Sequence, residues 1–507
     1  MPDDLSSVVP PATPPPAMPL PAEALQQEGP PPIPPVPPPP LPSVASAKEG
    51  PASQIVPSKK FPFKILIVVV LLLVLAGAGF LAFKLFGSLG NLSSTNLTWW
   101  GLWEPETVVK PLIDDYQKDH PGVKITYVQQ SPREYRERLQ TALSQSKGPD
   151  IFRLHNSWVP MFRSDLSPVP VSVFTAQSFD STFYPAARAD LKVGANYAAI
   201  PLMYDGLAMF VNDDLLKSTG LPVPQTWDDL RVVAQAMTKC DTSDGTCAAG
   251  AKILQSGAAL GTADNVDHWQ DILATLMLQN NVNLIAPAGK SAEDALSYYT
   301  IFVREDHMWD STLPASTFQF AAGKVGIYFG PSWRIFEILA QNPQLKFSTH
   351  PLPQLPVDPT RGEQPAAWAT YWAEAVNKKS AHAASAWDFL KFLSTPESLQ
   401  KLYQNAAASG RSFGEIYPRT DMADSLKDSP YVAAFIQQAP IARSWYLASG
   451  TWDGASGINS RLSTYFADAV NTTLQSGAAT NAVTTLSAGI TQVLSTYGLV
   501  AIPQVKK

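Results

Sequence analysis

Apolar runs with the spacing of strands and helices alternate along most of this chain, and the clearest example lies between Asn196 and Leu230. Residues 197–203 and 207–211 are apolar and of strand length, which predicts two buried strands separated by a short break. Asp205 lies in that break. The pattern therefore predicts that the chain crosses here from one packed unit into another, with Asp205 at the cleft between them.

Helix signals follow the second predicted strand directly. Asn212 can accept a hydrogen bond at the start of a short helix, and Gly220 can end that helix in the left-handed conformation. Thr226 and Asp229 have the spacing of a capping box, which predicts the start of the next helix. Local hydrogen bonds should therefore fix the structure immediately after the crossing.

The part of the chain before Asn196 alternates in the same way. Strands are expected at residues 97–100, 123–128 and 150–154, with an amphipathic helix in each interval. This β-α-β-α-β order predicts an α/β fold with a mainly parallel sheet and a ligand site at the carboxyl ends of its strands.

Aromatic and polar side chains follow two of those strand ends. Trp100, Trp103 and Glu104 come at or just after the first strand, and His155 and Asn156 follow the third. A sugar needs flat rings to cover its C–H faces and polar groups to bind its hydroxyls, and both kinds of side chain gather here. The alternative is that the tryptophans are core residues.

More rings occur in the second half of the chain. Trp333 follows a Gly-Pro break after a predicted strand, and the predicted strand 368–376 contains Tyr371 and Trp372. Residues from about 425 to 499 are expected to be almost entirely helical. The two tryptophans of that region in polar, Gly-rich surroundings are Trp445 and Trp452.

The amino-terminal part has a different character. Prolines crowd into residues 1–60, which predicts a disordered tail with polyproline II structure that serves as a spacer or docks SH3-like or WW-like partners. Residues 65–83 carry no charge, and as a helix they would span roughly 28 Å, which matches a bilayer core. The lysines at positions 59, 60 and 64 predict a cytoplasmic tail and an exported carboxyl-terminal part. The alternative is a cleaved signal peptide.

Charge and cysteine content narrow the function. The net charge of −6 leaves no basic groove for nucleic acid. The two cysteines, Cys240 and Cys247, can form a disulfide across a small loop in an exported protein. Two free thiols, or a Ca²⁺ site that uses Asp241 and Asp244, are the alternatives.

Several motifs in order resemble those of one family, the extracellular solute-binding proteins of ABC transporters. They are WWGLWEPE, HPGVKI, ERLQTALSQSKGPDIF, AAIPLMYDGLAMFVNDDLLKSTGLPVPQTWDDL, FAAGKVGIYFGPSW, HPLPQLP and SAHAASAWDFLKFLSTPESLQ. The resemblance covers Leu97 to about Leu499 and is strongest to the sugar-binding group that includes the maltodextrin-binding proteins. In two respects the chain departs from the family. Val211 stands where Tyr is usual, and the predicted anchor replaces the usual signal peptide or lipidated Cys.

The resemblance implies a periplasmic-binding-protein-like fold of type II, in which two α/β lobes are joined by a hinge of several crossings and close around a ligand. The expected domains are a Pro-rich tail (1–60), a transmembrane anchor (61–87), lobe 1 (95–208 with 370–408) and lobe 2 (212–368 with 412–500). The resemblance and the patterns above together predict these ligand-binding residues: Trp100, Trp103, Glu104, His155, Asn156, Tyr204, Asp205, Trp333, Tyr371, Trp372, Trp445 and Trp452.

The expected function is capture of a solute, with a sugar or oligosaccharide as the expected ligand, and delivery to ABC transporter permease subunits. The protein is expected to be a monomer without a cofactor or metal, single-pass in the cell membrane, with its binding domain outside. One alternative is a sensor ectodomain that signals to a membrane partner. The other is a glycan-active enzyme, for which the sequence offers neither a nucleophile motif nor histidines at metal-ligand spacing.

Overall fold

A computed structural model describes residues 94–357, 360 and 364–501 of the chain. The predicted Pro-rich tail and the predicted transmembrane segment lie outside these residues. Among the residues that the structure describes, no helix combines the length and the apolar character that a membrane crossing requires.

The first lobe is built on a five-stranded sheet with the order β2-β1-β3-β13-β6. Its first three strands are parallel, as the sequence predicts, and β13 runs antiparallel to both of its neighbours. The strands are β1 (Thr95–Gly101), β2 (Val123–Gln129), β3 (Ile151–His155), β6 (Ile200–Pro201) and β13 (Trp372–Val376). The helices of this part are α2 (Glu106–Asp119), α3 (Tyr135–Ser144), α4 (Val159–Phe162), α5 (Ala176–Thr182), α6 (Pro185–Asp190), α13 (Ala383–Leu393) and α14 (Pro396–Ala408).

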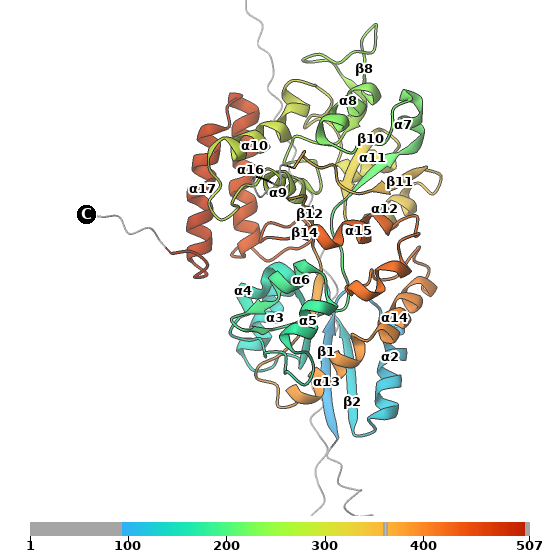
Figure 1. Cartoon of the computed structure of the whole chain (residues 1–507), viewed down its shortest axis with the longest axis vertical. Helices are drawn as coiled ribbons and strands as arrows, with labels where there is room; N and C mark the ends of the chain where they lie inside the picture. Colours follow the sequence, from blue (N-terminus) through green and yellow to red (C-terminus); the bar gives the residue numbers. More distant parts are fainter. Residues whose placement is uncertain (1–93, 358–359, 361–363, 502–507) are drawn as a thin grey trace, which may run out of the picture. The chain divides into compact units, whose positions relative to one another are not determined.

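The second lobe has its own five-stranded sheet, with the order β11-β7-β10-β9-β8. Its strands are β7 (Ala208–Asn212), β8 (Lys239–Cys240), β9 (Ile253–Ala258), β10 (Val325–Gly330) and β11 (Phe347–His350). Its helices are α7 (Asp213–Thr219), α8 (Trp227–Met237), α9 (Trp269–Gln279), α10 (Gly289–Arg304), α11 (Ser316–Ala321), α12 (Arg334–Gln341), α15 (Ala433–Gln438), α16 (Ile458–Ser476) and α17 (Thr480–Ser495). Figure 1 shows the two sheets one above the other, with the long α16–α17 pair at the side of the upper one.

The chain crosses between the lobes at the place that the sequence indicates. The first predicted strand contributes β6 to one sheet and the second forms β7 in the other. The predicted caps are also present. The side chain of Asn212 accepts from the backbone N–H of Leu215 at 3.1 Å, and Gly220 has a left-handed φ of 68°. Thr226 and Asp229 form the capping box of α8.

The second crossing differs from the prediction. Residues 368–376 do not form one strand: β12 (Ala367–Trp368) pairs with β14 (Ala442–Arg443), and the chain enters the first sheet only at β13. Residues 369–371 between them are irregular, because Ala369 and Thr370 bond to the neighbouring crossing segments, at Arg443 O and Asp205 O. Three crossing segments therefore lie side by side, and Thr370 and Tyr371 lie at the junction of the lobes.

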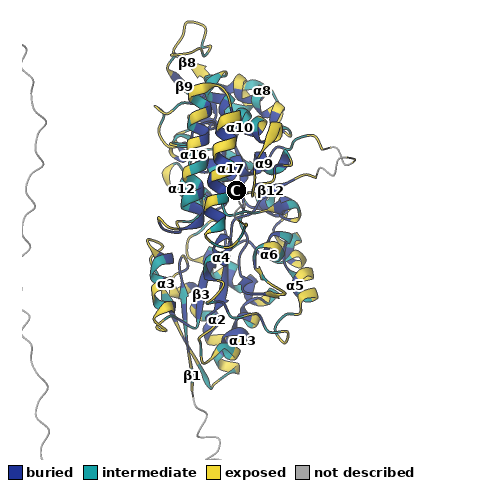
Figure 2. Cartoon of the chain, turned by 90° about the vertical axis from the view of Figure 1, so that its left-hand side faces the viewer, coloured by how far each residue is buried: buried dark blue, intermediate teal, exposed yellow. Residues whose placement is uncertain are grey.

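The interior of each lobe is apolar. In Figure 2 the strands and the inner faces of their covering helices are buried, and exposed residues lie on the outer helix faces. At the far end of the second lobe, Cys240 and Cys247 form a disulfide, with their Cα atoms 5.2 Å apart. The described part of the chain contains no group of His, Cys, Asp or Glu side chains that could hold a metal ion.

Candidate functional site

A cavity of about 770 Å³ lies between the two lobes. This is within the size range of small-molecule sites, roughly 300–1,000 Å³. Its walls come from the loop after β1, two of the three crossing segments (203–205 and 370–372), α9, the start of α12, the loop after α14, the segment from Ala448 to Trp452, and α16. The lining residues that carry the argument below are Trp103, Tyr204, Asp205, Gln270, Ser332, Trp333, Phe336, Tyr371, Trp372, Arg411, Glu415, Ser449, Thr451 and Trp452.

Exposed tryptophans are the main feature of these walls. Trp103, Trp333 and Trp452 are 45%, 40% and 57% exposed, although large aromatic side chains are usually covered. Trp103 meets the edge of Trp372 at a ring distance of 6.0 Å. The cavity therefore offers several flat apolar faces from both lobes.

Several residues of the same walls carry polar atoms without partners. Tyr204 Oη, Gln270 Oε1, Thr451 Oγ1 and Arg411 Nε are buried, and none has a hydrogen-bond partner among the described residues. All four residues line the cavity. An unsatisfied buried polar group costs about 1–3 kcal/mol, so a ligand rich in hydroxyl groups would gain by pairing with them.

Asp205 lies in the wall, but its carboxylate already has protein partners. Its Oδ1 accepts from the backbone N–H groups of Gly206 and Ser332 at 2.7 and 3.1 Å, and its Oδ2 accepts from the Ser332 hydroxyl at 2.9 Å. Burial raises the pKa of Asp205 to about 7. The carboxylate thus fixes the position of Ser332, and of the neighbouring Trp333, relative to the crossing segment that contains Asp205.

Glu104 does not line the cavity. It is 1% exposed, and its carboxylate pairs with Arg153 Nη1 at 2.6 Å. Arg153 also pairs with Glu374 at 2.7 Å, and Trp99 Nε1 donates to Glu374 at 3.0 Å. The partners come from β1, β3 and β13, so Glu104 belongs to a buried ion cluster within the first lobe.

His155 and Asn156 lie behind the wall. His155 accepts from the backbone N–H of Ser157 at Nδ1, so its Nε2–H donates to Thr370 Oγ1 at 3.1 Å, and its ring supports Trp372. Burial lowers the pKa of His155 to about 3. Asn156 donates to Asp190 at 3.0 Å and accepts from the backbone N–H of Tyr371 at 3.2 Å.

Trp445 and Trp100 are also outside the main cavity. Trp445 lines a separate cavity of about 290 Å³, together with Asn156 and Asp190. Trp100 is partly buried within β1, on the opposite face of the strand from Trp99, because successive strand residues alternate. The predicted residues that the structure brings together at the main cavity are Trp103, Tyr204, Asp205, Trp333, Tyr371, Trp372 and Trp452.

Some lining residues were not predicted from the sequence. Arg411 and Glu415 form an ion pair in the loop after α14, and the Arg411 guanidinium lies 4.7 Å from the ring centre of Phe336. Gln270 lies in the first turn of α9. The charged, Gly-rich sequence 410–415 was the feature that could have indicated Arg411 and Glu415. It follows a helix, whereas the prediction considered residues that follow strands.

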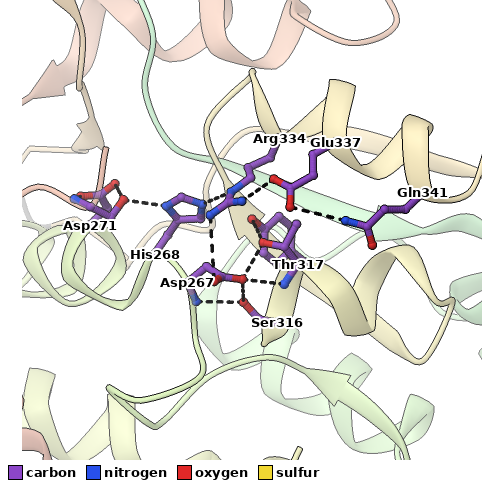
Figure 3. Close-up of polar contacts among 10 residues, drawn as sticks. Asp267, His268, Asp271, Ser316, Thr317, Arg334, Glu337 and Gln341 are labelled. Atoms are coloured by element: carbon purple, nitrogen blue, oxygen red, sulfur yellow. Dashed lines mark hydrogen bonds and ion pairs between the residues drawn. The ribbon is translucent and has the colours of Figure 1, made fainter. Parts of the chain in front are cut away.

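Figure 3 shows a polar network around Arg334 and His268, and Arg334 directly follows the wall residue Trp333. Arg334 Nε donates to His268 Nε2 at 2.9 Å, and His268 Nδ1 lies 2.6 Å from Ser449 Oγ. Because a guanidinium only donates, Nε2 is an acceptor and the neutral ring carries its proton on Nδ1. Ser449 then donates to Asp271 Oδ2 at 2.6 Å. His268 therefore cannot act as a base toward Ser449, and this contact is not a catalytic pair.

The sequence model described as "Bacterial extracellular solute-binding protein" matches residues 103–400. A curated relative, the maltotriose-binding protein of Pyrococcus abyssi (strain GE5 / Orsay), is 25% identical over 128 residues. That alignment covers 25% of this chain and 27% of the relative, so the chain spans about a quarter of the length of the relative that it matches.

Solved structures share the fold. The sugar-binding protein MalE from Xanthomonas citri superposes with a TM-score of 0.63 at 20% identity, over 79% of this chain and 98% of that one. The cyclic α-maltosyl-1,6-maltose binding protein from Arthrobacter globiformis gives 0.63 at 17% identity, over 79% and 99%. These likenesses establish the two-lobed, periplasmic-binding-protein-like α/β fold.

Proposed function

Since this chain belongs to the family of bacterial extracellular solute-binding proteins, we propose that it captures an oligosaccharide in the cavity between its lobes. The observation that carries the proposal is the combination of exposed tryptophans and unpaired buried polar atoms around one cavity. The C–H faces of a sugar ring stack on aromatic faces, and its hydroxyls pair with amide, hydroxyl and guanidinium groups.

The ligand class fits the charges of the wall. Arg411 and Glu415 neutralise each other, and the Asp205 carboxylate accepts three protein hydrogen bonds. The charged groups of the wall are therefore already paired within the protein, which suits a ligand without a net charge. The names of similar proteins favour maltose-type oligosaccharides as the first ligands to test.

We further propose that the bound sugar is delivered to the permease of an ABC transporter and that the apolar stretch 65–83 tethers the protein to the membrane. The family supports the first statement. The length of the stretch and the lysines before it support the second, with the tail in the cytoplasm and the binding lobes outside. The proposed lobe boundaries are 95–208 with 370–408 and 212–368 with 412–500.

Isothermal titration of the full-length chain in detergent micelles tests the binding proposal. Maltose, maltotriose, maltoheptaose and mannobiose would be compared with sorbitol and a dipeptide. We expect one-site binding of at least one oligosaccharide without its hydrolysis. Binding of only the dipeptide, or turnover of the sugar, would overturn the proposal.

Membrane tethering has a separate test. The full-length chain and a variant with three Asp residues in the apolar stretch (Val69→Asp, Leu72→Asp and Leu75→Asp) would be expressed and the cells fractionated. We expect the wild type in the membrane fraction after a carbonate wash and the variant in the supernatant. Release of both by carbonate would contradict an integral anchor.

A further inference from the structure

The polar network behind the cavity runs from one exposed ring, Trp333, to the segment that carries another, Trp452. At one end, the Arg334 guanidinium lies 4.3 Å from the centre of the Trp333 ring, a distance at which cation and ring attract each other. At the other end, Ser449 belongs to the segment that carries Trp452. A hydrogen bond from Arg334 to His268 (Figure 3) and a second one between His268 and Ser449 connect these ends.

The Arg334 end is held firmly. Its guanidinium pairs with Glu337 one turn along α12, and its Nη2 lies 4.0 Å from Asp267. Asp267 is fixed in turn by the backbone N–H of Thr317 at 2.8 Å and by the hydroxyls of Ser316 and Thr317. The arginine that stacks on Trp333 therefore has a defined position relative to the second lobe.

The Ser449 end is equally constrained. Asp271, which is 0% exposed, accepts from both the backbone N–H of Ser449 at 2.9 Å and its hydroxyl at 2.6 Å. His268, which is 1% exposed, donates to the same hydroxyl and also meets the edge of Trp333 at a ring distance of 5.8 Å. Each hydrogen bond that links Arg334, His268, Ser449 and Asp271 has a defined donor and acceptor. The network therefore favours one arrangement of these four side chains.

We propose that His268 and Arg334 are positioning residues that fix Trp333 relative to Trp452 and thereby set the length of saccharide that the cavity prefers. This inference rests on the proposed function. A ligand long enough to stack on both rings benefits from their fixed spacing, whereas a ligand that reaches one ring does not. Loosening the network should therefore weaken long ligands more than short ones.

Arg334→Met and His268→Phe test the proposal from two points of the network. Met keeps the apolar stem of the arginine, and Phe keeps the ring shape of the histidine. Arg231→Met is the matched control, because Arg231 is a paired arginine of the same lobe, bonded to Asp306 at 2.7 and 2.8 Å, and does not line the cavity. Affinities for maltose, maltotriose and maltoheptaose would be measured by titration of the full-length proteins.

In the wild type we expect maltoheptaose to bind more tightly than maltose. In Arg334→Met and in His268→Phe the ratio of these affinities should fall about fivefold, the effect of losing one aromatic stacking contact. Arg231→Met should leave the ratio unchanged. In the double variant the affinity ratio should fall no further than in the more affected single variant, because both residues act through the same hydrogen-bond network.

Other outcomes would overturn the inference. They are an unchanged ratio in both single variants, an equal fall in the Arg231→Met control, or additive effects in the double variant. If the wild type binds no saccharide, the proposed function fails and this inference fails with it. If the wild type binds saccharides and only the ratio test fails, the proposed function stands. Should one single variant not fold, the other still decides.

Discussion

The carboxylate of Glu137 lies against the backbone of Gly454. A Cβ at position 454 would come within 1.6 Å of Glu137 Oε1, and Gly454 has a left-handed φ of 76°. Glu137 is on α3 of the first lobe, and Gly454 is in the segment before α16 of the second. Beside them, Arg136 is 5% exposed and donates to Ser456 Oγ at 3.1 Å. The lobes therefore meet closely here, two residues beyond the cavity residue Trp452.

This contact predicts that Gly454→Ala weakens saccharide binding. The added methyl group takes the place of the side-chain ends of Glu137 and Arg136, so these side chains must move and the contact between the lobes is disturbed. Gly220→Ala is the control, because its φ is 68° and nothing lies within 4 Å of the added Cβ. Both variants lose about 1–2 kcal/mol of stability to backbone strain. Titration should show about tenfold weaker binding for Gly454→Ala alone, and equal affinities would contradict a role for the contact in closure.

Asp205 predicts a pH dependence of stability. Its pKa rises from the ordinary value of about 3.9 to about 7 on folding. The folded chain therefore holds more protons than the unfolded chain between these values, and this contribution to stability is full below about pH 4 and is lost as the pH rises to about 7. In Asp205→Asn the amide keeps an acceptor for Gly206 and Ser332 and cannot titrate.

The comparison between wild type and Asp205→Asn isolates this group. His155 and His268 have pKa values lowered by burial to about 3, so they act in the opposite direction and favour the folded state as the pH rises. Free energies of unfolding from urea titrations at pH 4.5 and 7.5 would be compared. We expect the variant to gain stability relative to wild type at the higher pH, and a difference that does not change with pH would refute the assignment.

The ion pairs of Arg153, which does not line the cavity, predict a large effect of its substitution on stability. It is 2% exposed and pairs with both Glu104 and Glu374. Arg153→Met leaves two buried carboxylates without their cation, which should cost about 3–5 kcal/mol in the free energy of unfolding. Urea denaturation measures this cost. Lys110→Met, which removes an exposed pair with Asp114, should cost less than about 1 kcal/mol and serves as the control.

Trp452 and Trp445 offer a matched pair of substitutions. Trp452 lines the main cavity and is 57% exposed, whereas Trp445 lines the smaller one. Trp452→Ala should weaken oligosaccharide binding about tenfold or more, because an exposed aromatic face is lost from the cavity wall. Trp445→Ala should leave the affinity unchanged. Titration of both variants decides, and the reverse order of effects would place the ligand in the smaller cavity.

The sequence by itself determined those features of this protein that depend on near neighbours in the chain. The caps at Asn212 and Thr226 were predictable because each hydrogen bond closes over three residues. The parallel order of β1, β2 and β3 followed from alternating strands and helices, since crossovers of this kind have one favoured hand. The crossing near Asp205 was visible because two apolar runs flank a single break.

Only the tertiary structure decided which side chains face the ligand cavity. Glu104 follows a strand end as Trp103 does, yet Arg153 and Glu374 from distant strands draw its carboxylate into the first lobe. Trp445 and Trp452 lie in one segment, but this segment lines two cavities, and Trp445 lines the smaller one and Trp452 the larger one. Contacts between residues hundreds of positions apart set these directions, and local patterns carry no information about such partners.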